Sequence, residues 1–200
     1  MKKLVALVLT LCAMLTLTGC SGKYPERAAD GSAWNRDWTI LGTVLGVEEP
    51  GNGLTLSENP VVLTGDDTHY ATWTIGEAAA YTNEDGKETE LYDAQLYLLL
   101  YGCADEAGAD EAVADWIERE QEVYQITDVV SENCNGQAYT VLLYEVVSDT
   151  NPYARGAVAF GVYENYAVSA ELTCVDSFTG DAHEILTVFL TGCHYSAELN

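Results

Sequence analysis

The alternation of apolar and polar residues predicts that β-strands dominate the first half of the chain beyond residue 34. We expect strands over 38–47, 60–64 and 69–81, each bounded by clusters of Gly, Pro, Asn or Asp. The third run has the two-residue period of a strand with one buried face. Its apolar side is Ala71, Trp73 and Ile75, and its other side is Tyr70, Thr72 and Thr74.

The run at 95–103 is more uniformly apolar and predicts a central strand. Asp85-Gly86, shortly before it, is a hairpin signal. The two sides of the run differ, because one carries three leucines and the other carries two tyrosines. The leucine side is Leu96, Leu98 and Leu100, and the opposite side is Tyr97, Leu99 and Tyr101.

Apolar residues then recur at three- and four-residue spacing, which predicts a helix near 109–125 and a C-terminal helix near 179–192. Between these helices we expect three strands, 137–147, 154–163 and 166–175, which short loops join in antiparallel order. The fold class is therefore α+β, an antiparallel sheet with both helices packed on it. This order of elements, over about residues 54–195, resembles the PsbP-like α/β sandwich. The resemblance implies a fold, and no functional residue is transferred from it.

Residues 1–19 have the pattern of an export signal. Lys2 and Lys3 precede an apolar run from Leu4 to Leu17, which is shorter than the roughly 20 residues that a membrane-spanning helix needs. A cleaved secretory signal is therefore favoured over a permanent transmembrane anchor.

The sequence Leu17-Thr18-Gly19-Cys20 resembles the lipobox of bacterial lipoproteins. In that family the cysteine thiol receives a diacylglycerol, and a peptidase then cuts just before the cysteine. The resemblance implies that acyl chains such as palmitate on Cys20 anchor the mature chain in the cell membrane. An ordinary cleaved signal with an incidental cysteine is the alternative. We expect three parts: a signal peptide at 1–19, a flexible tether at 20–33, and a single extracytoplasmic domain at 34–200.

The composition restricts the partners of that domain. The chain has 8 Lys and Arg against 32 Asp and Glu, a formal net charge of -24. Nucleic acid is excluded as a partner because its binding needs a basic surface. Anionic lipid headgroups would repel the protein, so the lipid and not the protein surface would hold it at the membrane. The hydrophobic content of 48% also argues against disorder.

Four cysteines remain after the signal peptide and Cys20 are set aside, and four thiols allow three disulfide pairings. Cys174 lies on the apolar side of its predicted strand, and Cys193 lies on the apolar stripe of the helix that follows. We therefore predict a Cys174–Cys193 disulfide, with Cys103–Cys134 by elimination. Buried free thiols are the alternative. The absence of Cys-x-x-Cys argues against redox chemistry, and the spacing of the cysteines and histidines argues against a zinc site.

Tyrosine is abundant, with 13 residues, and its rings suit sugar- and peptide-binding surfaces. Tyr70, Tyr97 and Tyr101 share the outer sides of two predicted strands and form our candidate ligand-binding patch. Tyrosines half-buried under a helix would give the same pattern.

Motifs for catalysis are missing from the sequence. It has no Gly-x-Ser-x-Gly, no His-Glu-x-x-His and no phosphate-binding glycine loop, and we expect no metal and no cofactor. The leading hypothesis is a non-catalytic, lipid-anchored envelope protein that binds a partner protein, peptide or glycan. The alternative is an envelope hydrolase that uses carboxylates or His183. A purely structural or assembly role is the third possibility.

Overall fold

The computed structural model describes residues 45–47, 53–56, 68–83, 85–148 and 150–195. The predicted signal peptide, Cys20, the predicted tether and the strand expected at 60–64 lie outside the described residues. Of the strand expected at 38–47, only its last three residues are described.

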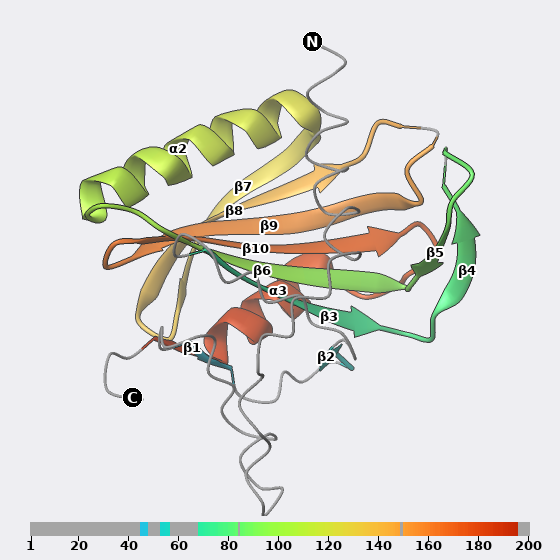
Figure 1. The fold of residues 1–200 in the computed structure, drawn as a ribbon, viewed down its shortest axis with the longest axis horizontal. Coiled ribbons are helices and arrows are strands. Elements are labelled where there is room, and N and C mark those ends of the chain that lie inside the picture. Colours follow the sequence, from blue (N-terminus) through green and yellow to red (C-terminus); the bar gives the residue numbers. More distant parts are fainter. Residues whose placement is uncertain (1–44, 48–52, 57–67, 84, 149, 196–200) are drawn as a thin grey trace, which may run out of the picture.

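The described chain contains one large sheet, two helices and two small strand pairs (Figure 1). The helices are α2 (Glu106–Val123) and α3 (Ala182–Thr191). The strands are β1 (Leu45–Val47), β2 (Thr55–Leu56), β3 (Thr68–Ile75), β4 (Ala79–Thr82), β5 (Glu88–Leu91), β6 (Ala94–Gly102), β7 (Gln125–Cys134), β8 (Gln137–Glu145), β9 (Tyr153–Tyr163), β10 (Tyr166–Val175) and β11 (Cys193–Tyr195).

The large sheet has seven strands in the order β2-β3-β6-β10-β9-β8-β7, and every neighbouring pair is antiparallel. The helices α2 and α3 lie on opposite sides of this sheet (Figure 1). The α+β fold class is therefore confirmed. The predicted central strand is also confirmed, because β6 lies inside the sheet between β3 and β10.

Side-chain alternation divides the core into two unequal parts. The larger cluster lies between the sheet and α3 and includes Leu96, Leu98 and Leu100, all of which are buried as the leucine side of β6 predicts. The smaller cluster lies between the sheet and α2 and includes Tyr144 and Phe160. Tyr97, Leu99 and Tyr101 occupy the α2 side of β6 and are more exposed than the three leucines.

Both predicted helices form, with shifted ends. Helix α2 begins earlier than residue 109, because the side chain of Asp105 accepts a hydrogen bond from the Gly108 amide and caps the first turn. Helix α3 begins later than residue 179, because Asp181 caps it by accepting from the amides of His183 and Glu184.

Two details of the strand pattern differ from expectation. The run at 69–81 is divided, because Gly76 has a φ of 90° and ends β3 before the β4–β5 hairpin begins. The strand β7 was not expected, and it follows α2 directly. Asn135 and Gly136 form the tight β7–β8 turn with φ angles of 50° and 83°, so Asn-Gly was the signal that could have revealed β7.

No helix in the described part of the chain is long and apolar enough to cross a membrane.

Candidate functional site

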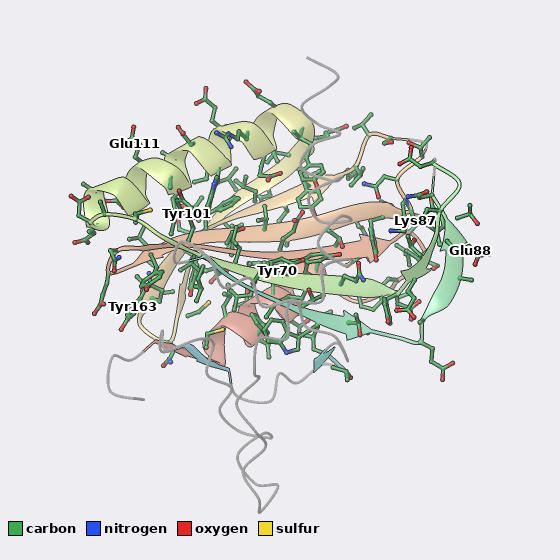
Figure 2. The ribbon with its side chains drawn as sticks, viewed as in Figure 1. Tyr70, Lys87, Glu88, Tyr101, Glu111 and Tyr163 are labelled. Carbon is green, nitrogen blue, oxygen red and sulfur yellow. The ribbon has the colours of Figure 1, made fainter. Side chains whose placement is uncertain are left out.

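The three tyrosines of the predicted patch lie on the α2 side of the sheet, where they form two separate aromatic contacts. The rings of Tyr70 and Tyr97 stack with centroids 5.7 Å apart and planes at 27°. Tyr101 lies nearer to α2 and meets Trp116 edge-on at 6.2 Å. Figure 2 shows Tyr101 beside α2 and Tyr70 farther along the sheet. The structure therefore brings Tyr70 and Tyr97 into contact and places Tyr101 in a separate contact with the helix.

Hydrogen bonds hold the Tyr97 side of this patch in place. The hydroxyl of Tyr97 donates to Gln95 Oε1 at 2.5 Å, and the hydroxyl of Tyr153 donates to the same oxygen at 2.6 Å. Burial raises the pKa of Tyr153, so its phenol remains a donor across the physiological pH range. Two phenols thus fix one amide oxygen on the surface of the sheet.

Next to Tyr97 lies a carboxylate that sequence reasoning did not single out. Glu171 of β10 is the direct register partner of Tyr97 on one side and of Val158 on the other. Its Oε1 accepts hydrogen bonds from the Tyr144 hydroxyl at 2.6 Å and from the Tyr124 hydroxyl at 3.4 Å. The rings of Tyr124 and Tyr144 stack face to face, with centroids 4.1 Å apart and planes at 7°.

A second carboxylate completes this group, which we call the tyrosine–glutamate cluster: Glu120, Tyr124, Tyr144 and Glu171. Burial and then repulsion by Glu171 raise the pKa of Glu120 to about 7. Burial raises the pKa of Glu171, although the two phenol hydrogen bonds oppose that rise. Within the described residues neither carboxylate has an ion-pair partner. The cluster therefore retains a proton near neutral pH, as two carboxylates that share a desolvated site do.

Gly156 makes room for this arrangement. It is the register partner of Tyr144, and a Cβ atom at this position would overlap both the Tyr144 phenol and the Leu172 carbonyl. The Tyr144 ring can therefore cross β9 and reach Glu171 on the far strand. This close approach explains why a glycine stands in the middle of a strand.

His183, the candidate base of the hydrolase alternative, lies on a different surface. It lines a cavity of about 390 Å³ at the start of α3, together with Thr127, Glu145, Arg155 and Asp181. Its Nε2 lies 2.8 Å from Glu132 Oε1, a distance at which a protonated imidazole forms an ion pair. The Arg155 guanidinium donates to the carbonyl oxygens of Phe178 and Gly180. Arg155 therefore holds the loop before α3 on the sheet.

No hydroxyl or thiol among the described residues is hydrogen-bonded to His183 in a nucleophile–base pair. The described chain also contains no group of three side chains that could hold a metal ion. The side chains of His69 and His194 lie outside what the structure describes.

The four cysteines of the domain are unpaired in the structure. Cys134, Cys174 and Cys193 belong to the core between the sheet and α3, and Cys103 lies at the end of β6 before α2. Cys174 and Cys193 share this core as the periodicity predicts, but α3 separates them along its length. Disulfide formation stays a prediction, and the fold limits which thiols can meet.

Comparisons with known proteins show similarity in fold alone. No protein-family model matches the chain, and no curated protein sequence matches it. One similar solved structure is the cyanobacterial PsbP protein CyanoP from Synechocystis sp. PCC 6803, with 8% identity, a TM-score of 0.41, and coverage of 67% of this chain and 95% of that one. Another is PA94 from Pseudomonas aeruginosa, a protein of unknown function described as a putative regulator, with 14% identity, a TM-score of 0.32, and coverage of 51% and 85%. At these values neither likeness says anything about function.

Proposed function

We propose that this protein is a lipid-anchored extracytoplasmic binding domain, and that its ligand lies on the α2 side of the sheet over Tyr70 and Tyr97. The observation that carries the proposal is the stacked Tyr70–Tyr97 pair, in which Tyr97 is hydrogen-bonded to Gln95 and has Glu171 as its register partner. Flat rings with polar groups at their edges bind the apolar face of a sugar or a peptide side chain.

The charge of the protein narrows the class of ligand. The net charge is -24, and Glu171, the register partner of Tyr97, has no cationic partner among the described residues. A polyanion would be repelled from this surface. The ligand is therefore a neutral or positively charged glycan or peptide of the envelope.

Calorimetric titration of the full chain in detergent tests this proposal. The panel contains neutral oligosaccharides, cationic peptides and anionic peptides. We expect binding from one of the first two classes and none from the third. Tyr70→Ala and Tyr97→Ala should each weaken binding by about two- to tenfold, because a lost stacking contact costs about 0.5–1.5 kcal/mol.

Tyr81→Ala is the matched control, because Tyr81 also lies in a strand but belongs to the β4–β5 hairpin. Its affinity should equal that of the unaltered protein. Equal affinities for Tyr70→Ala and the unaltered protein would reject this surface as the binding site.

The anchor has its own test. The resemblance of Leu17-Thr18-Gly19-Cys20 to a lipobox supports acylation of Cys20. We expect the full chain to sediment with membranes and to gain the mass of a diacylglycerol, and Cys20→Ser to lose both properties. If the Cys20→Ser variant fractionates with membranes as the unaltered chain does, the lipid anchor is rejected while the binding surface stays open to its own test.

The perturbed pKa of Glu120 favours one second candidate, a hydrolase with a carboxylate acid and base. A carboxyl group whose pKa is about 7 can donate and accept a proton near neutral pH, and Glu171 lies close enough to raise it. This candidate places the chemistry at Glu120 and not at His183. It requires turnover of an envelope glycoside or peptide that Glu120→Gln abolishes and His183→Gln leaves intact.

A further inference from the structure

The fold separates the thiols that the sequence pattern pairs. Cys174 lies at one end of β10, where Arg155 is its register partner, and the Arg155 guanidinium holds the loop before α3. Cys193 lies just beyond the far end of α3, after the cap residue Gly192. The ten residues of α3 span about 15 Å, whereas a disulfide needs Cα atoms within about 7 Å.

Cys103 and Cys134 are also kept apart. Cys103 follows β6, and Cys134 is the last residue of β7. The strands β10, β9 and β8 lie between β6 and β7 in the sheet. Four strand spacings amount to about 19 Å across the sheet.

Cys134 and Cys193, in contrast, meet at one corner of the molecule. Cys134 ends β7 immediately before the β7–β8 turn, and the side-chain amide of Asn135 in that turn donates to the carbonyl oxygen of Cys193 at 3.0 Å. In Figure 1 the end of α3 and the β7–β8 turn lie together at the lower left, while β10 ends at the right.

The surroundings of both thiols agree with this placement. The exposed fractions of Cys134 and Cys193 are 2% and 1%, and both side chains belong to the core between the sheet and α3. The hydroxyl of Thr191, at the end of α3, lies within hydrogen-bonding reach of the Cys134 thiol. The proximity of Cys134 adds to the effect of burial in raising the pKa of the Cys193 thiol.

We propose that Cys134 and Cys193 form a structural disulfide that fastens the end of α3 to the β7–β8 edge of the sheet, and that Cys103 and Cys174 remain thiols. The reaction uses a disulfide-bearing oxidant, either a small molecule or a thiol oxidoreductase of the envelope. One cysteine thiolate attacks the oxidant and releases a first thiol. The second thiolate then attacks the mixed disulfide and releases the second thiol, so two protons and two electrons leave the protein.

Oxidation must precede the final packing of this corner. Burial raises the pKa of both thiols, so in the folded state few thiolates are present to react. Burial also protects the finished disulfide from external reductants until heating opens this corner of the fold. The supply of oxidant in the cell depends on the proposed export, whereas the pairing itself depends on the fold alone.

The experiment has two arms, which separate the pairing from the export. In the first, reduced full chain is refolded in detergent with oxidised glutathione, alkylated and digested. Mass spectrometry should find a peptide linked through Cys134 and Cys193, with Cys103 and Cys174 alkylated after denaturation. A Cys174–Cys193 or Cys103–Cys134 peptide, or alkylation of all four cysteines of the domain, would overturn the proposal.

In the second arm the chain is isolated from cells after thiols are trapped with acid. The same linked peptide is expected. A linked peptide in the first arm, with all four cysteines of the domain free in the second, would reject the proposed export and leave the pairing standing.

Thermal unfolding provides a check that does not depend on peptide mapping. Dithiothreitol should lower the Tm of the oxidised protein by roughly 10 °C, because the disulfide closes a long loop of the unfolded chain. The Cys134→Ser/Cys193→Ser variant should melt at the lower temperature and ignore the reductant. Cys174→Ser, the matched control at a buried position, should keep its full response to dithiothreitol.

Discussion

The same strands form both faces of the large sheet, but different interactions stabilise the packing on each face. The face toward α3 buries aliphatic side chains such as Leu98 and Leu172, whose contribution depends on the area removed from water. The face toward α2 buries Tyr144 against the carboxylate of Glu171, so its contribution depends on a hydrogen bond being made. Adjacent residues of one strand therefore differ in how tolerant they are of change, and the following predictions compare them.

Neighbouring leucines of β6 give the largest expected difference. Leu98 is fully buried on the α3 side, and Leu99 is partly exposed on the α2 side. Leu98→Ala should lower the free energy of unfolding by about 3 kcal/mol, and Leu99→Ala by about 1 kcal/mol, because only the first leaves a closed cavity. Urea unfolding measures both values. Equal losses would contradict the difference between the two faces.

The tyrosine–glutamate cluster should respond to the loss of single hydroxyl groups. Tyr144→Phe removes the 2.6 Å hydrogen bond to Glu171 and should lower the free energy of unfolding by about 2 kcal/mol, because it leaves a buried carboxylate with a donor missing. Tyr124→Phe removes the longer bond of 3.4 Å and should cost less than half as much. Urea unfolding of both variants tests this order, and the reverse order would show that the distances do not reflect the strengths of the two bonds.

The same cluster should make stability depend on pH. The pKa of Glu120 rises from 4.5 to about 7 on folding, so between these values the folded chain binds more protons than the unfolded chain. The contribution of Glu120 is therefore complete below about pH 4.5 and is lost as the pH rises through about 7. Unfolding at pH 5 and pH 8 measures this loss.

Glu120→Gln should reduce the difference in unfolding free energy between pH 5 and pH 8 by roughly 2 kcal/mol, less than the full linkage value because solvent screens a partly exposed carboxylate. Glu118→Gln is the control, because Glu118 is exposed on the same helix. If both variants keep the pH dependence of the unaltered protein, it arises from carboxylates other than Glu120.

The caps of the two helices should show the smallest effects. Asp181 accepts from two backbone amides at the start of α3, and Asp105 accepts from one at the start of α2. Asp181→Ala should cost about 1 kcal/mol and Asp105→Ala about half as much. Thermal unfolding resolves the order. A larger loss for Asp105→Ala would mean that α2 depends on its cap more than α3 does.

The sequence pattern predicted the strands and helices where one face of an element is buried and the other is not. The leucine side of β6, the hairpin at Asp85-Gly86 and the tight connection between β9 and β10 all follow from local signals. The pattern did not predict β7. This edge strand has mostly exposed side chains, and its sequence therefore shows little apolar alternation.

The candidate site was predicted in part. Its tyrosines were found because alternation assigns Tyr70, Tyr97 and Tyr101 to the outer sides of their strands. The alternation that places Cys174 on the apolar side of β10 places Glu171 on the opposite side, where a solvent-exposed carboxylate is the ordinary expectation. Its burial could not be foreseen, because the two phenols that bind it come from α2's end and from β8, far away in sequence.

Apart from β7 and the break at Gly76, the sequence alone determined the elements and the face that each residue occupies, because a period of two or of 3.6 residues is a property of the local backbone. It also determined the acidity, and it is the basis of the export signal that we propose for residues 1–20. The order of strands in the sheet decided which residues that are far apart in the sequence come into contact. It placed Tyr144 over Gly156 to reach Glu171, and it set Cys134 rather than Cys174 beside the end of α3. The distance between residues on different strands depends on how the whole chain folds, and a local sequence pattern does not encode it.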